Sequence, residues 1–132
     1  MKPIALTTEK FAETVEQEGI VVIDFWASWC APCRMFAPTF EAAANKHEDI
    51  VWAKVDTEAE PEIAGALKIR AIPTLMVFRD GILVFAQPGV LPARVLDEVV
   101  EKTRALDMVQ IRKEVDEAEK KKSADRRDVT SQ

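Results

Sequence analysis

Cysteine and histidine are scarce in this chain of 132 residues, which has two cysteines, Cys30 and Cys33, and one histidine, His47. A structural zinc ion takes four such ligands, so a single copy of the chain lacks the set for a typical zinc site. We therefore expect no bound metal. Two copies that pool their thiols in a metal or iron–sulfur site remain the alternative. His47 lies in a polar stretch, where we expect a solvated side chain.

Basic charge and long apolar runs are also in short supply. The formal net charge is -5 at pH 7 and no dense basic patch occurs before residue 120, which argues against nucleic acid as the main partner. No apolar stretch approaches the roughly 20 residues of a membrane-spanning helix, and the N-terminus has no apolar region typical of a secretory signal. We therefore expect a cytoplasmic protein without a membrane partner. The chain also lacks G-x-G-x-x-G, so we expect no bound dinucleotide.

The apolar residues that are present alternate between strand and helix patterns. With 48% hydrophobic residues, the chain is suited to one compact domain with its own core. Strands that alternate with helices, followed by a hairpin and a helix, predict an α/β fold of three layers, α/β/α, around a mixed sheet. The predicted strands are 20–27, 50–55, 75–78 and 82–85, and the predicted helices begin near Thr7, Pro32, Pro61 and Pro92.

The end of the chain differs in kind from the rest. After a domain over residues 1–106, Asp107 and Gln110 have the spacing of a helix-capping box and predict an appended amphipathic helix over residues 107–122. Residues 123–132 are polar and charged, and we expect them to be disordered. We expect the apolar stripe to pack on its own domain, with a second copy or another partner as alternatives. The stripe consists of Met108, Ile111, Val115 and Ala118.

The two cysteines form a C-x-x-C pair where an apolar strand ends and a helix begins. A thiol at a helix start is acidified, because the helix dipole and the free N–H groups favour the thiolate. We expect Cys30 to be partly exposed and Cys33, one turn later, to be more buried. The second thiol can close a disulfide with the first, which allows exchange of two electrons with another disulfide. This context favours a redox motif over half of a metal site.

Asp24 interrupts the apolar run of the strand that precedes the cysteines. A carboxyl group there is costly unless it is paired or protonated, and burial would raise its pKa. A buried carboxyl with a raised pKa can accept a thiol proton near neutrality. The simpler alternative is a carboxylate at a strand edge that bonds to nearby backbone.

Several separated motifs resemble the thioredoxin family in order and spacing. They cover roughly residues 3–105 and include Trp-Cys-Ala-Pro-Cys at 29–33, Asp-Phe-Trp-Ala at 24–27, Pro38, Lys54 and Ile-Pro-Thr at 72–74. Two departures are Ala31, where the family usually has glycine, and the extension after residue 106. The resemblance implies a thioredoxin fold with a mixed five-stranded sheet.

The resemblance also implies the chemistry of a thiol–disulfide oxidoreductase that reduces protein disulfides. Cys30 attacks the substrate disulfide, and Cys33 resolves the mixed disulfide. Asp24 is expected to accept the proton of Cys33, with Lys54 as its charge partner. Pro32 offers no hydrogen-bond donor to the Cys30 thiolate, which favours a reductase over an oxidase.

For substrate binding, the resemblance implies a cis proline beside the cysteines. The backbone of Ile72, before Pro73, would then pair with an extended substrate by strand addition. The expected substrate-binding residues form an apolar surface around the first cysteine. They are Trp29, Pro32, Ile72, Pro73, Gly89 and Val90.

The implied partners are disulfide-containing proteins and thioredoxin reductase, which would recycle the Cys30–Cys33 disulfide with electrons from NADPH. We expect a monomer, with a dimer through residues 107–122 as the alternative. A different class of function is an interaction or holdase subunit that keeps the fold but acts through the extension.

Overall fold

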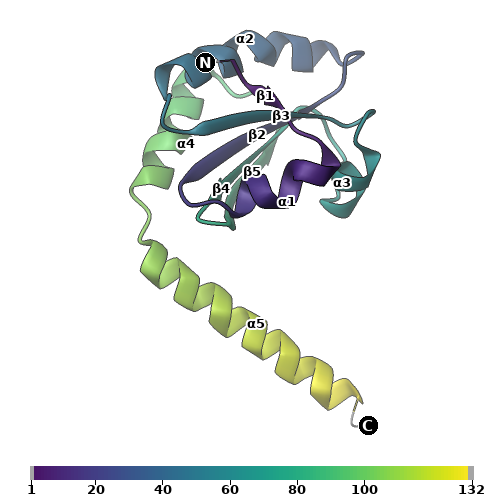
Figure 1. Cartoon of the computed structure of the whole chain (residues 1–132), viewed down its shortest axis with the longest axis vertical. Helices are drawn as coiled ribbons and strands as arrows, with labels where there is room; N and C mark the ends of the chain where they lie inside the picture. Colours follow the sequence, from purple (N-terminus) through teal and green to yellow (C-terminus); the bar gives the residue numbers. More distant parts are fainter. Residues whose placement is uncertain (1, 131–132) are drawn as a thin grey trace.

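The computed structural model describes the backbone of residues 2–130 and the side chains through residue 125, in a domain from which one long helix projects (Figure 1). The strands are β1 (Ile4–Ala5), β2 (Ile20–Trp26), β3 (Val51–Asp56), β4 (Thr74–Arg79) and β5 (Ile82–Pro88). The helices are α1 (Thr8–Glu16), α2 (Ala31–Lys46), α3 (Pro61–Ala66), α4 (Ala93–Arg104) and α5 (Met108–Thr130).

The five strands form one mixed sheet in the order β1-β3-β2-β4-β5. β3 runs parallel to β1 and β2, whereas β4 is antiparallel to both β2 and β5. The parallel pairs are joined by helical crossovers, and β4 and β5 by a turn at Asp80 and Gly81, both with positive φ. The predicted mixed α/β/α architecture is therefore confirmed.

The two faces of the sheet are covered by different helices, α2 and α4 on one and α1 and α3 on the other (Figure 1). β2 is central, so every one of its residues except Trp26 is buried. Side chains alternate along a strand. Ile20 and Val22 pack with α2 and α4, while Val21 and Ile23 pack with α1. The same alternation places Asp24 on the face covered by α2.

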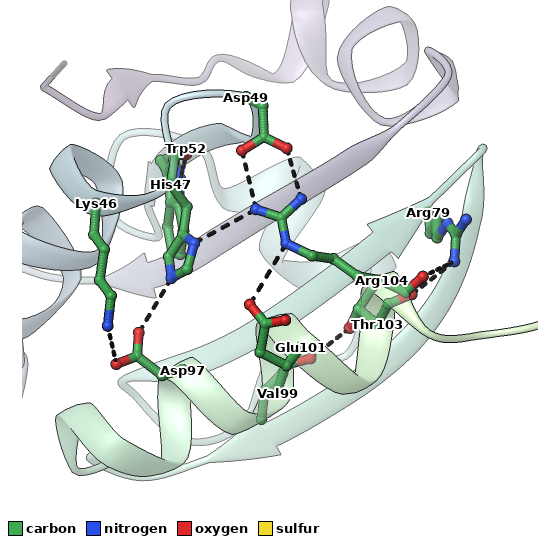
Figure 2. A network of polar contacts seen from close by, with 10 residues as sticks. All are labelled: Lys46, His47, Asp49, Trp52, Arg79, Asp97, Val99, Glu101, Thr103 and Arg104. Atoms are coloured by element: carbon green, nitrogen blue, oxygen red, sulfur yellow. Dashed lines mark hydrogen bonds and ion pairs between the residues drawn. The ribbon is translucent and has the colours of Figure 1, made fainter.

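A polar network joins the end of α2 to α4 (Figure 2). His47 was expected to be solvated, but its side chain is only 10% exposed and the ring stacks on Trp52. Its Nε2 lies 3.2 Å from Asp97, which also accepts a hydrogen bond from Lys46 at 2.9 Å. These two hydrogen bonds hold the pKa of Asp97 below its ordinary value. The expectation failed because α4, distant in sequence, packs over the end of α2.

Arg104 extends this network from the last turn of α4. Its guanidinium forms a two-pronged ion pair with Asp49, with N–O distances of 2.6 and 3.0 Å. The Arg104 hydrogen bonds lower the pKa of Asp49 to about 2. Only arginine offers this planar, two-pronged geometry. The pair therefore fixes the orientation of α4 relative to the loop that holds Asp49, in addition to attracting it.

Arg79, at the end of β4, closes the C-terminal end of α4. Its Nη1 donates to the carbonyl oxygens of Thr103 and Arg104 at 2.7 and 3.2 Å (Figure 2). It also donates to the Leu106 carbonyl at 3.0 Å. The last carbonyls of a helix have no partner inside it, and a cation there also complements the helix dipole. The chain therefore leaves α4 in a defined direction.

α5 differs from the expectation in length and in placement. The predicted helix over 107–122 instead continues to Thr130, and the predicted disordered tail over 123–132 is helical as far as it is described; residues 131–132 lie outside the described residues. Residues 118–128 contain no glycine or proline and are rich in Ala, Lys, Arg and Glu, which favour helix. The expected capping by Asp107 is present, since its Oδ1 accepts from the Gln110 N–H at 3.1 Å.

The apolar stripe of α5 does not pack into its own domain as expected. None of its four residues is buried, and the helix points away from the sheet (Figure 1). One hydrogen bond, from Arg112 Nη2 to the Asp80 carbonyl at 2.7 Å, ties the first turns of α5 to the β4–β5 turn. No helix within the described part of the chain is long and apolar enough to cross a membrane.

Phe40 is the aromatic centre of the α2 face, fully buried with its ring 5.2 Å from Trp52 and 5.9 Å from Phe36. We predict that Phe40→Ala lowers the free energy of unfolding by about 3–5 kcal/mol, because it removes a buried ring and leaves a cavity. Guanidinium denaturation of the oxidised protein measures this loss. Met35→Ala, on the exposed side of α2, is the control and should change stability by less than about 0.5 kcal/mol. Equal effects of the two variants would contradict this assignment of the core.

Candidate active site

The two cysteines lie where β2 passes into α2. Cys30 is the N-cap residue of α2, and its Sγ accepts a hydrogen bond from the Cys33 N–H at 3.2 Å. The two residues form a disulfide, with Cα atoms 5.2 Å apart. The helix start thus directs a backbone N–H at the Cys30 sulfur, the arrangement that favours a thiolate once the disulfide is reduced.

Cys30 is more buried than expected. It is 4% exposed and Cys33 2% exposed, so the two differ little in the oxidised protein. Together with Ala27 they form a small apolar cluster, against which Trp26 and Ile72 pack. Cys30 was expected to be partly exposed because it lies just before the helix. That local pattern could not predict that the segment around Ile72, distant in the sequence, would pack against Cys30.

The segment before β4 lies directly beside the disulfide. Its Ile72–Pro73 peptide bond is cis, as the resemblance implied, and the Ile72 carbonyl oxygen is 3.7 Å from Cys30 Sγ. The Gly89 N–H donates to the Pro73 carbonyl at 2.8 Å, which brings the end of β5 to the same place. Gly89 has a φ of +99°, a conformation that other residues rarely adopt. Val90 follows it and is 43% exposed.

Exposed side chains extend from the disulfide onto the surface. Trp29 is 66% exposed, and its indole N–H donates to Glu58 Oε1 at 2.8 Å. Pro32 is also exposed, whereas Pro73 is buried and contributes no open surface. The sequence reasoning missed Glu58, which carries no motif signal in its loop. It also missed Met35, which is 72% exposed and lies two residues after Cys33, so its place in the helix could have indicated it.

Asp24 is fully buried, and neither of its carboxyl oxygens has a hydrogen-bond partner among the described residues. Burial raises the pKa of Asp24 from its ordinary value of 3.8 to about 6, an effect that the positive charge of Lys54 partly offsets. Lys54 is the direct neighbour of Asp24 in the β2–β3 register. Its ammonium group lies 4.7 Å from the ring centre of Trp26, a cation–π contact.

A disulfide of this C-x-x-C type, at a helix start and surrounded by exposed apolar groups, can exchange electrons with another disulfide but offers little to a metal. The described residues contain no group of three or more His, Cys, Asp or Glu that could hold a metal ion. Fold and site together define a thiol–disulfide oxidoreductase.

Comparison with known proteins agrees with this class. The family model described as Thioredoxin matches residues 2–103. The chain belongs to the thioredoxin family.

Named relatives and solved structures support the same family. A protein named putative thioredoxin 2 from Streptomyces coelicolor is 51% identical over 114 residues, covering 86% of this chain and 85% of the relative. Thioredoxin 1 of Synechococcus elongatus is 41% identical, covering 74% and 94% of the two chains. A mutant thioredoxin from Halobacterium salinarum superposes with a TM-score of 0.73 at 29% identity, covering 80% and 93%. Oxidised mitochondrial thioredoxin 3 from Saccharomyces cerevisiae gives a TM-score of 0.70 at 29% identity, covering 76% and 94%.

The raised pKa of Asp24 predicts how stability depends on pH. The folded protein holds this proton up to a pH of about 6, whereas the unfolded chain releases it near 3.8. The favourable contribution is therefore complete below pH 3.8 and is lost as the pH rises through 6, by about 3 kcal/mol in total. Asp24→Asn should remove this loss, so the variant should be more stable than the parent at pH 8 by that amount.

Denaturation of both oxidised proteins at several pH values between about 3.5 and 8 would measure this dependence, because that range includes the whole interval between the two pKa values. Asp116→Asn, at an exposed position on α5, is the control and should leave the pH dependence unchanged. An identical pH dependence in Asp24→Asn and the parent would contradict the buried, unpartnered state of this carboxyl group.

Proposed function

We propose that this thioredoxin reduces protein disulfides in the cytoplasm, with Cys30 as the attacking thiolate and Cys33 as the resolving thiol. The observation that carries the proposal is the hydrogen bond from the Cys33 N–H to Cys30 Sγ at the start of α2. It supports Cys30 as the sulfur whose negative charge the helix would stabilise, because backbone N–H groups and the helix dipole act most strongly at the helix start.

The reaction transfers two electrons and two protons to the substrate. In the reduced protein, Cys30 Sγ attacks one sulfur of the substrate disulfide; a mixed disulfide forms, and the other substrate sulfur leaves as a thiolate and takes a proton. The Cys33 thiol then loses its proton and attacks Cys30 Sγ. The Cys30–Cys33 disulfide forms, the mixed disulfide breaks, and the second substrate sulfur leaves and is protonated.

Asp24 is the proposed proton acceptor for Cys33. It is buried on the face of the sheet that α2 covers, and its pKa of about 6 suits proton transfer near neutral pH, unlike that of an ordinary exposed carboxyl group. Lys54, beside it in the sheet, stabilises the negative charge that Asp24 acquires when it releases a proton. Lys54 thereby acts as a positioning residue and does not itself contact the sulfurs.

Substrates are proposed to bind as extended segments across the exposed surface around the disulfide. The Ile72 carbonyl, 3.7 Å from Cys30 Sγ, is placed to pair with the substrate backbone next to the reacting sulfur. Trp29 and Val90 offer apolar area, and Pro32 and Gly89 leave room for a chain to approach. Pro73 holds the segment beneath them. An exposed apolar surface of this kind favours a protein substrate over a small molecule.

Recycling is proposed to use thioredoxin reductase and NADPH. Thioredoxins in general are reduced by this enzyme, and the chain is 51% identical over 114 residues to a putative thioredoxin from Streptomyces coelicolor. We further propose that residues 1–106 form this redox domain and that α5 is an extension with its own role. A protein acting only as an interaction subunit through α5 would retain its biological activity after both cysteines are replaced.

Replacement of each cysteine separates the two proposed roles. Cys30→Ser should reduce insulin disulfides no faster than background with thioredoxin reductase and NADPH, because no nucleophile remains at the helix start. Cys33→Ser should also fail to turn over, but it should accumulate a mixed disulfide between Cys30 and substrate, which mass spectrometry of the intact adduct detects.

Ser28→Ala, beside the cysteines, is the control for these variants and should keep normal turnover, since the hydrogen bond of Ser28 among the described residues uses its backbone carbonyl, which accepts from Arg34 at 2.8 Å. A mixed disulfide that forms on Cys33 in the Cys30→Ser variant, and not on Cys30 in the other, would reverse the assignment.

Pro32 has no side-chain hydrogen-bond donor for the Cys30 thiolate, and this absence favours reduction of substrate disulfides over their formation. Pro32→His would add an imidazole donor close to Cys30 and stabilise its thiolate, which makes the dithiol form more favourable. The reduction potential should rise by roughly 30 mV or more, equivalent to about 1.4 kcal/mol. Equilibration with glutathione or a thioredoxin of known potential measures the change. Glu41→His, at an exposed position further along α2, should leave the potential unchanged, and an equal shift in both variants would refute the argument.

A further inference from the structure

An apolar groove of about 510 Å³ lies between α4 and the edge strand β5, separate from the disulfide. Its apolar lining comprises Val84, Phe85, Leu91, Val95, Val99 and Leu106. β5 is last in the sheet order, so its outer edge pairs with no other strand of the described chain. Groove and open edge together form an apolar surface that the domain covers only in part, since its apolar lining residues are partly buried except Val99, which is buried.

α5 carries a second apolar surface, the stripe of Met108, Ile111, Val115 and Ala118, in which Ala118 is exposed and the other three side chains are only partly buried. The rest of this helix is mostly charged, apart from residues such as Val109, and its stripe ends where the next positions in the pattern are Lys122 and Asp125. An amphipathic helix gains most of its stability from packing its apolar face against something else. The stripe therefore needs an apolar surface to pack against, about as long as two heptads of a helix.

The junction between α4 and α5 keeps these two surfaces apart within one chain. Only residues 105–107 separate the helices, and Asp107 is engaged in capping α5. Arg79 binds the last carbonyls of α4, and Arg112 binds the Asp80 carbonyl, so both ends of the connection are tied to the β4–β5 hairpin. α5 consequently points away from the domain although Leu106, just before it, lines the groove (Figure 1).

We propose that the groove of one copy receives the α5 stripe of a second copy, and that the exchange is reciprocal in a symmetric dimer. Both surfaces are present in every chain, so two copies related by a twofold axis satisfy both grooves and both stripes at once. The dimer buries apolar area that the monomer exposes, without any change in the fold of the domain. The disulfide and the surface around it take no part.

Charge supports this occupant and its direction. Along α4 an acid, Glu98, which also pairs with Arg94 at 2.9 Å, precedes a base, Lys102, at the rim of the groove. Along α5 the acidic Glu114 likewise precedes a basic run, residues 120–122. A partner helix that lies antiparallel to α4 therefore places Glu114 near Lys102 and the basic run near Glu98, with opposite charges facing each other.

Direct pairing of two α5 stripes is less favourable. The stripe spans only two heptads, whereas coiled coils are recognised from three or four. In a parallel pair with the stripe at the core positions, Glu114 of one helix would also face Glu119 of the other, like against like. The groove offers an apolar surface without this repulsion.

Sedimentation equilibrium of the full-length oxidised protein tests the proposal. The wild type should form a dimer that dissociates on dilution. Ile111→Lys in the stripe and Val95→Lys in the groove should each raise the dissociation constant by about tenfold or more, because each introduces a charge into an apolar contact. Val109→Lys, on an 83% exposed position of the same helix outside the stripe, is the matched control and should dimerise as the wild type does.

A second experiment, in which the charges of two residues are exchanged, distinguishes loss of dimerisation from failure to fold. Lys102→Glu should weaken the dimer, and adding Glu114→Lys to the same chain should restore it, while insulin reduction and the circular dichroism spectrum stay unchanged in both. A wild type that is monomeric at every concentration would overturn the proposal. So would a dimer that Ile111→Lys disrupts and Val95→Lys does not, since that result identifies stripe-to-stripe pairing.

Discussion

The start of α2 is the constraint on which the site depends. One backbone N–H, that of Cys33, points at the sulfur of Cys30 because Cys30 occupies the N-cap position. For that geometry to exist, β2 must end at Trp26 and α2 must lie across the sheet, held there by a buried face that includes Phe40. The central strand and the aromatic core therefore fix the position of the helix start at which the Cys30 sulfur lies.

The buried carboxyl group of Asp24 lowers the stability of the folded protein when it is ionised. A carboxyl group with no hydrogen-bond partner among the described residues, fully buried in the central strand, destabilises the folded protein whenever it is ionised. Lys54 offsets part of this cost. A neutral residue of similar size would avoid the cost of ionisation, and this trade between stability and activity is consistent with the proposed role of Asp24 as proton acceptor.

Away from the disulfide, long-range polar contacts organise the other end of the domain. The contacts of His47 and Arg104 tie α2 to α4, and Arg79 ties α4 to the hairpin (Figure 2). These contacts join segments far apart in the sequence, and they set the direction in which α5 leaves the domain. The extension is therefore part of the architecture, held at its base by the hydrogen bond from Arg112 to the Asp80 carbonyl, next to the Arg79 hydrogen bonds that close α4.

The sequence by itself determined the fold class, the family and the redox pair, because apolar periodicity and the C-x-x-C spacing are local patterns. It also indicated the buried carboxyl group of Asp24. Only the tertiary structure decided what distant segments do. It buried Cys30 against Ile72, enclosed His47 beneath α4 and directed α5 away from the sheet. The physical reason is that burial and direction depend on which surfaces meet, and those surfaces come from residues that no local pattern connects.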